Sequence, residues 1–141
     1  MSADLHFPSA DARELVRVAL AEDLGPRGLD VTTLATIPAD QEATAEVVAR
    51  APGVVAGIPV IAEVLTQVAA LIDSPAPTVR TLVTDGTRVG RGDVLAQITG
   101  PIRVILIAER TLLNIMSRLS GVATHTRRWA DQLDGTGAMV L

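Results

Sequence analysis

Residues 102–119, IRVILIAERTLLNIMSRL, hold the strongest periodic pattern of the chain and predict a helix. One apolar stripe of this helix would be formed by Ile105, Leu112, Met116 and Leu119. A second strip, on another face, would be formed by Leu106, Arg110, Leu113 and Ser117. A helix with apolar residues on two sides is normally buried on two sides. We therefore expect part of its packing surface to come from another subunit or from sequence beyond this chain.

Arg110 lies within the second strip, where a guanidinium needs an anionic partner. The residues alone allow two interpretations. Arg110 can form a structural ion pair with an acidic residue elsewhere in the chain. Alternatively, its planar fork of N–H groups can bind the carboxylate or phosphate of a ligand.

The composition indicates one folded domain with an aliphatic core. The chain has 141 residues, of which 48% are hydrophobic, and its only aromatic residues are Phe7 and Trp129. The mean hydropathy of +0.38 excludes intrinsic disorder. Apolar runs such as residues 104–108 are too short to span a membrane. Because no secretory pattern follows Met1, we expect a cytoplasmic protein.

Charge and residue usage exclude several classes of function. The chain has no cysteine, which removes disulfides, thiolate catalysis and sulfur-ligated zinc. Its net charge of −4 argues against a general nucleic-acid binder. Residues 1–99 contain seven arginines and 13 acidic residues, whereas residues 100–141 contain five arginines and three acidic residues, so the positive potential lies in the last third. No lysine is present, which excludes a Schiff base and a lysine-linked lipoyl or biotinyl group.

Turn residues and periodicity divide the chain into elements. Before the central helix we expect a helix over residues 11–24, a hairpin of residues 42–51 with 54–56, a helix from Pro59 to before Pro75, and paired strands over residues 78–84 and 94–99. After it, Gly121 is predicted to separate residues 102–119 from a further helix ending near Leu133, followed by a buried strand over residues 138–141. Residues 30–38 are too short and polar to assign.

Other polar groups are weaker candidates for chemistry. The Gly90-Arg91-Gly92 and Gly135-Thr136-Gly137 stretches lack the features of a dinucleotide loop and are interpreted as turns. The remaining candidates also have simpler structural interpretations: Ser120 as a helix end, His125 packed near Trp129, adjacent Glu22 and Asp23 as a solvated helix end, and His6 in a loose terminus.

Six sequence blocks, in order along nearly the whole chain, resemble the quinolinate phosphoribosyltransferase family, also called carboxylating nicotinate-nucleotide pyrophosphorylases. The blocks are LAEDLG at 20–25, DVTT at 30–33, GVVAG at 53–57, Asp85-Gly86 with Val89 and Gly92, AERTLLN at 108–114 and LSGVAT at 119–124. Each block alone is weak, but their order makes the resemblance specific. A paralogous branch linked to molybdenum transport shares much of this pattern.

The resemblance implies an α+β fold. Members of the family are about twice as long and consist of an open-faced α/β sandwich followed by a seven-stranded α/β barrel. Residues 1–120 would form the sandwich domain, including the long interface helix, and residues 121–141 would begin the barrel. With Mg²⁺, the family transfers ribosyl phosphate from phosphoribosyl pyrophosphate to the ring nitrogen of quinolinate. The product loses CO₂ to give nicotinate mononucleotide in NAD biosynthesis.

The resemblance also implies a role for Arg110, which matches the arginine that reaches across a homodimer to quinolinate in the neighbouring subunit. The Thr-Arg-Lys-Thr motif of the family should follow Leu141, and the Mg²⁺ ligands lie further on. We therefore expect no catalytic residue and no metal ligand within this sequence. Because the reaction needs a dense cationic site, we expect these 141 residues to be inactive alone.

Two alternatives stay open beside the enzyme. A non-catalytic dimerisation or binding module would keep the interface helix without the chemistry. Residues 83–99 also have the spacing of half a biotinyl or lipoyl domain, although the absence of lysine excludes the carrier function.

Overall fold

The structure, a computed structural model, describes residues 9–25, 28, 30–138 and 140. Its helices and strands follow one another as α1 (Ser9–Leu24), α2 (Val31–Thr36), β1 (Glu42–Val48), β2 (Gly53–Val54), α3 (Ile58–Leu71), β3 (Thr78–Thr81), β4 (Arg88–Val89), β5 (Val94–Pro101) and α4 (Ile102–Leu133). The predicted α+β class is confirmed, since two small antiparallel sheets pack against separate helices.

β5 is the central strand of a three-stranded antiparallel sheet in the order β1-β5-β3. One face of this sheet is polar, as shown by the contact between the hydroxyls of Thr44 and Thr99 and by the hydrogen bond that Gln97 donates to Glu46. Ala96 and Ile98 of the same strand are buried. This alternation is typical of a sheet that is covered on one side.

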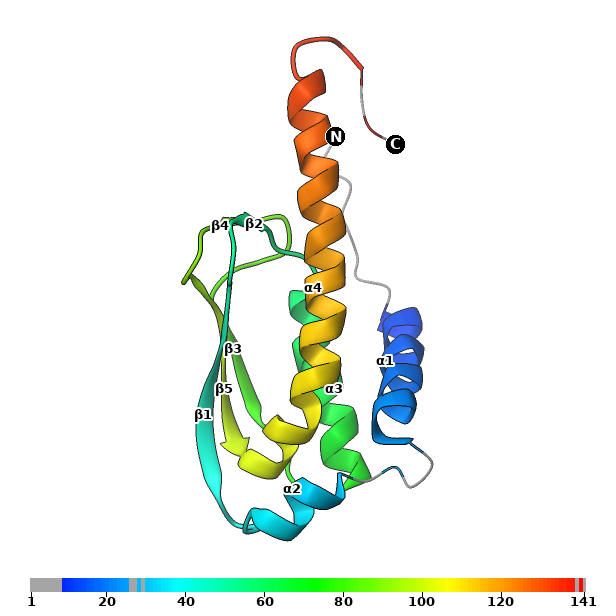
Figure 1. The fold of residues 1–141 in the computed structure, drawn as a ribbon, viewed down its shortest axis with the longest axis vertical. Coiled ribbons are helices and arrows are strands. Elements are labelled where there is room, and N and C mark those ends of the chain that lie inside the picture. Colours follow the sequence, from blue (N-terminus) through cyan, green and yellow to red (C-terminus); the bar gives the residue numbers. More distant parts are fainter. Residues whose placement is uncertain (1–8, 26–27, 29, 139, 141) are drawn as a thin grey trace.

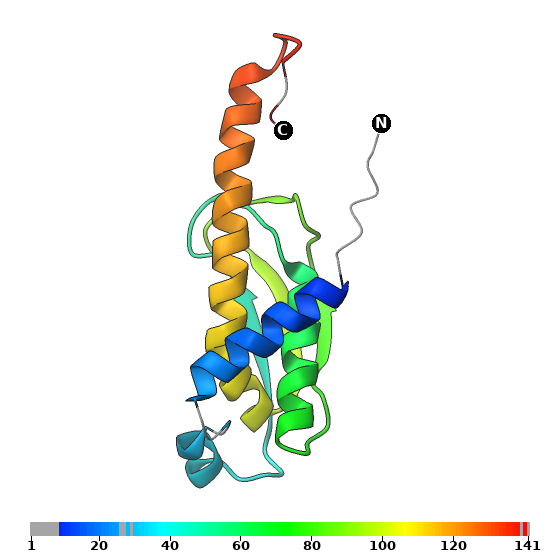
Figure 2. The same cartoon turned by 90° about the vertical axis from the view of Figure 1, so that its right-hand side faces the viewer.

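Helices α3 and α4 cover one face of the sheet, and α1 crosses them on the side away from the sheet (Figures 1 and 2). The apolar stripe predicted for the helix after Pro59 is confirmed: Ile61, Val64 and Val68 have no exposed surface. Val16 of α1 is equally buried. The core is therefore an aliphatic layer between the helices and the sheet.

The expected hairpin of residues 42–51 with residues 54–56 is wrong. β1 pairs with β5 over seven residue positions, whereas the two-residue β2 pairs with β4. β2 is too short to satisfy the backbone of β1, and β5 offers a full-length partner. The predicted pairing of the strands within residues 78–84 and 94–99 is confirmed, because β3 pairs with β5.

The expected break at Gly121 is also wrong, because α4 runs without interruption from Ile102 to Leu133. On either side of this glycine, side chains of α4 bind the backbone around β2. Ser120 Oγ lies 3.1 Å from Ala56 N, and Thr124 Oγ1 lies 2.8 Å from Val54 N. These contacts hold α4 against β2 on both sides of Gly121, a position where the low helix propensity of glycine would otherwise favour the end of a helix.

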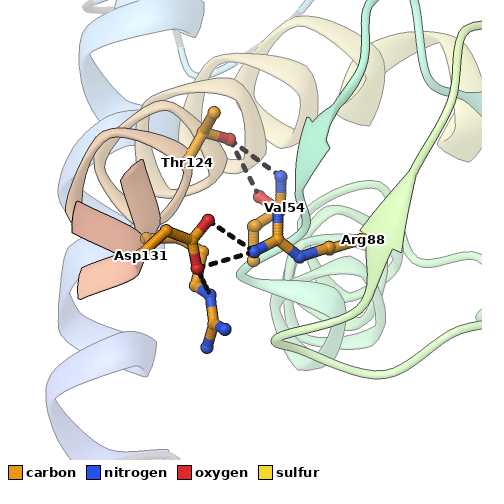
Figure 3. A network of polar contacts seen from close by, with 5 residues as sticks. Val54, Arg88, Thr124 and Asp131 are labelled. Carbon is orange, nitrogen blue, oxygen red and sulfur yellow. Dashed lines mark hydrogen bonds and ion pairs between the residues drawn. The ribbon is translucent and has the colours of Figure 1, made fainter. Parts of the chain in front are cut away.

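A charged network attaches the next turns of α4 to β4 (Figure 3). Asp131 accepts a hydrogen bond from Arg88 Nη2 at 2.6 Å and one from Arg127 Nε at 2.7 Å. These two arginines lower the pKa of Asp131, chiefly through the hydrogen bond from Arg88. The last turns of α4 project past the sheets (Figure 1).

The remaining predictions about local structure have mixed outcomes. The helix predicted over residues 11–24 is confirmed, although it begins at Ser9. The region left unassigned contains α2. The strand predicted over residues 138–141 includes residues 139 and 141, which lie outside the described residues, as does His6. Among the described residues, no helix is long and apolar enough to cross a membrane.

Candidate functional site

Arg110 lies on the outer face of α4, opposite the end of α1. Its Nε is 3.3 Å from Oδ1 of Asp23. The Asp23 side chain is 20% exposed, but the Arg110 side chain is 78% exposed. An ion pair with an acid elsewhere in the chain is therefore present, and it leaves most of the guanidinium accessible to another partner.

Arg110 borders a hollow of about 340 Å³ formed by α1, α2 and α4. Its walls are lined by Asp23, Leu24, Asp30, Val31, Leu106, Ile107 and Arg110. The carboxylates of Asp23 and Asp30 and the guanidinium of Arg110 thus line one hollow, together with aliphatic side chains. The hollow joins residues from three of the six sequence blocks.

Asp30 is the N-cap of α2. Its Oδ1 accepts a hydrogen bond from Thr33 N at 3.0 Å, and its Oδ2 accepts one from Thr33 Oγ1 at 2.6 Å. These hydrogen bonds, that from the hydroxyl first, lower the pKa of Asp30. Both carboxylate oxygens are therefore used to begin the helix.

Arg103 fixes α2 against the start of α4, and sequence reasoning missed it. Its Nε donates to the carbonyl oxygen of Ile37 at 2.7 Å, and its Nη2 donates to that of Leu34 at 3.0 Å. A positive charge in the first turn of a helix interacts unfavourably with the helix dipole. The position of Arg103 therefore indicates that its side chain stabilises a different element. Here it satisfies carbonyls at the C-terminal end of α2.

The two apolar stripes predicted for α4 differ in burial. Ile105, Leu112 and Met116 are buried, whereas Leu119 at the end of that stripe is 37% exposed. On the second strip Leu106 is 37% exposed and Leu113 is 43% exposed. The strip that contains Arg110 is therefore an exposed apolar surface in this chain. This agrees with the prediction that one of the two apolar sides of the helix is not covered by these residues.

A larger groove of about 530 Å³ lies between residues 47–55 and α4. Ser120 and Thr124 line it, but their hydroxyls already bind the backbone of Ala56 and Val54. The polar groups left at its rim include His125 and Arg128. His125 is exposed and meets Trp129 edge-on at 6.2 Å between ring centroids, which confirms that the two residues share one face of the helix.

The other weak candidates have structural roles. Residues 90–93 form a turn with Gly92 at a φ of 95°, as predicted. Ser120 does not end a helix, contrary to the expectation. Glu22 is exposed and Asp23 points to Arg110, so these adjacent acids diverge as expected, but Asp23 is not part of a solvated end.

The chemistry available in the described part of the chain is anion binding. No group of three or more His, Asp or Glu residues there is arranged to hold a metal ion. Arg110 combines exposure, an ion pair at Nε and a neighbouring apolar surface. This combination suits a planar carboxylate ligand better than a general acid or base.

Comparison with known proteins agrees with this fold. The model of the quinolinate phosphoribosyl transferase N-terminal domain family matches residues 30–120. A carboxylating nicotinate-nucleotide pyrophosphorylase of Mycobacterium leprae is 41% identical over 140 residues, which cover 99% of this chain and 47% of that protein. A chloroplastic enzyme of the same name from Oryza sativa is 41% identical over 124 residues, covering 88% of this chain and 32% of that protein.

Solved structures give the same result. The nicotinate-nucleotide pyrophosphorylase of Francisella tularensis superimposes with a TM-score of 0.80 at 28% identity, over 92% of this chain and 44% of that chain. NadC from Streptococcus pyogenes superimposes with a TM-score of 0.80 at 30% identity, over 94% and 44% of the two chains. This chain thus spans between about a third and about half of these relatives. Because the family model matches well over half of it, the chain belongs to the quinolinate phosphoribosyl transferase family, in the region of its N-terminal domain.

Proposed function

We propose that these residues are the N-terminal part of an enzyme that joins quinolinate to phosphoribosyl pyrophosphate, with release of pyrophosphate and CO₂, to form nicotinate mononucleotide for NAD biosynthesis. The observation that carries this proposal is the exposed, anchored Arg110 in a chain 41% identical to a carboxylating nicotinate-nucleotide pyrophosphorylase. The names of these relatives favour quinolinate over the substrate of the molybdenum-transport-linked branch.

We further propose the finer architecture implied by the family. Residues 1–120 form an open-faced sandwich and residues 121–141 lead into an α/β barrel, with α4 crossing the boundary between them. Two copies associate through the open strip around Leu106 and Leu113, which are large apolar residues left exposed. In this arrangement Arg110 reaches the quinolinate bound by the other copy.

The task of Arg110 in this mechanism is to bind and orient substrate. Quinolinate carries two carboxylates, and a guanidinium binds a carboxylate through two parallel hydrogen bonds. Such binding would fix the ring nitrogen relative to the ribose carbon that it attacks. Mg²⁺, which would accompany the pyrophosphate leaving group, does not fit the described residues, because they lack a suitable ligand cluster. We assign no step on this chain to the metal.

A chimera tests the proposal. These 141 residues replace the matching region of the Mycobacterium leprae relative, which supplies the remainder. We expect the chimera to form nicotinate mononucleotide from quinolinate. Arg110→Ala should lower kcat/KM for quinolinate by about 100-fold, because a charge-assisted bidentate contact contributes about 3 kcal/mol.

Arg118→Ala is the matched control, since Arg118 is an exposed arginine on the same helix with no ion pair among the described residues. It should leave kcat/KM near that of the parent chimera. A folded chimera without activity, or an unchanged KM for quinolinate in Arg110→Ala, would contradict the proposed function. In the alternative of a pure interface module, the chimera assembles but Arg110→Ala has no kinetic effect.

A further inference from the structure

The contact between Arg110 and Asp23 divides the guanidinium into two edges. Asp23 Oδ1 approaches Nε, at 3.3 Å. Among the described residues, no hydrogen bond involves Nη1 or Nη2 of Arg110. The edge formed by these two nitrogens can bind a carboxylate through two parallel hydrogen bonds, as can the edge that includes Nε. Asp23 thus contacts the guanidinium at Nε, and the Nη nitrogens make no hydrogen bond within the described residues.

Asp23 is held in place by its own helix. Leu20, one turn earlier on α1, is 2% exposed, and Val16 before it is fully buried. Asp23 itself is only 20% exposed, whereas its partner is 78% exposed. The carboxylate is therefore the more buried member of the pair, and the guanidinium is the more exposed one. A fixed contact at Nε reduces the freedom that the long arginine side chain must lose when it binds a ligand.

The two neighbouring acids do not share this task. Asp30 lines the same hollow, but its oxygens accept the hydrogen bonds from Thr33 that begin α2. Glu22 is adjacent to Asp23 in sequence, but it lies about 100° around the helix and is exposed. No ion pair of Glu22 is present among the described residues. Of these three acids, the contact with Arg110 is specific to Asp23.

We propose that Asp23 is a positioning residue for substrate binding: it holds Arg110 by Nε so that the Nη edge meets a carboxylate of the dicarboxylate substrate. This inference rests on the proposed function, because Arg110 must contact the substrate for its orientation to matter. Asp23 acts through Arg110 and does not itself touch substrate. Its negative charge also opposes an anionic ligand, so the orienting effect must exceed that repulsion.

Kinetics of the chimera compare Asp23→Asn with Glu22→Gln, which removes the same charge one residue away. We expect Asp23→Asn to raise the KM for quinolinate about fivefold, with the KM for phosphoribosyl pyrophosphate unchanged. Glu22→Gln should stay within about twofold of the parent, since its charge is exposed and screened. Asp23→Glu, which keeps a carboxylate, should recover part of the loss. A KM for quinolinate that is unchanged or lower in Asp23→Asn would overturn the inference.

A spectroscopic measurement on the 141-residue chain separates this inference from the proposed function. The Nε–H resonance of Arg110 should shift in Asp23→Asn, and its ¹⁵N relaxation should show greater mobility, while Glu22→Gln leaves both unchanged. If the parent chimera is inactive, the proposed function fails whatever this resonance does. If the chimera is active and the resonance is unaffected by Asp23→Asn, the positioning role fails and the function stands.

Discussion

Thr111, the residue after Arg110, is 3% exposed and its hydroxyl has no hydrogen-bond partner in the described part of the chain. Thr33 is similarly buried at 8%, but its hydroxyl donates to Asp30 at 2.6 Å. A buried hydroxyl without a partner costs free energy, whereas a paired one contributes to stability. The same side chain therefore has opposite effects at these two positions.

Thr111→Val is expected to raise the free energy of unfolding by about 1 kcal/mol, because a methyl group replaces an unsatisfied hydroxyl of nearly the same shape. Thr33→Val, the matched control, should lower it by about 1 kcal/mol. Urea unfolding of the 141-residue chain measures both. Destabilisation by Thr111→Val would mean that its hydroxyl finds a partner in solution.

Asp30 makes part of the stability depend on pH. Its folded pKa lies below the ordinary value because Thr33 donates two hydrogen bonds to it. The stabilisation is present in full above the unfolded pKa of about 3.9, and it is lost as the pH falls through the lower folded pKa. Asp30→Ala should cost about 1 kcal/mol at pH 7, and its difference from the parent chain should shrink below about pH 4. A difference that stays constant over this range would contradict the assignment. Unfolding measured at several pH values checks it.

At the scale of elements, α4 docks closely on the backbone around β2 because two glycines permit it. A Cβ added to Gly53 would lie 2.6 Å from Thr124 Oγ1, and one added to Gly57 would lie 2.8 Å from Leu119 Cδ1. Gly57 also has a φ of 97°, in the left-handed region. The GVVAG and LSGVAT blocks are therefore two halves of one contact, and Asp85 of a third block accepts a hydrogen bond from Ile58 N beside it.

Gly53→Ala is expected to lower the free energy of unfolding by about 1–3 kcal/mol, because the new methyl group must displace Thr124 and break its hydrogen bond to Val54. Thermal unfolding, combined with the Thr124→Val variant, measures this contact. The double variant should be much less destabilised than the sum of the two single variants. Full additivity would show that the two residues do not interact.

Gly121→Ala should have the opposite effect and raise the free energy of unfolding by about 0.5–1 kcal/mol. Gly121 lies inside α4, and a Cβ there would meet no atom within 4 Å. Alanine therefore gains helix propensity without a clash. Circular dichroism and thermal unfolding of the 141-residue chain check the result. A loss of helix or of stability would indicate that the helix bends at this position.

At the scale of the whole molecule, the described residues present one arginine of the proposed substrate site and lack an enclosed catalytic centre. Arg110 and the exposed Leu106 and Leu113 point away from the core and need a second surface. We therefore expect the purified 141-residue chain to form no detectable nicotinate mononucleotide, because one arginine cannot neutralise a dicarboxylate and a pyrophosphate. Turnover by a preparation free of host enzyme would contradict this expectation. A coupled assay with both substrates measures it.

The sequence by itself determined the α+β class, the aliphatic core, the helices over residues 11–24 and 102–119, and Arg110 as a candidate ligand-binding cation. The core and the helices follow from local periodicity and turn residues, whereas the α+β class follows from the family resemblance of the sequence blocks. Only the tertiary structure decided that β1 pairs with β5, that α4 continues through Gly121, and that Asp23 is the partner of Arg110. Each of these depends on atoms brought together from distant parts of the chain. Local propensity is too weak to specify such contacts, because backbone pairing and packing energies exceed it.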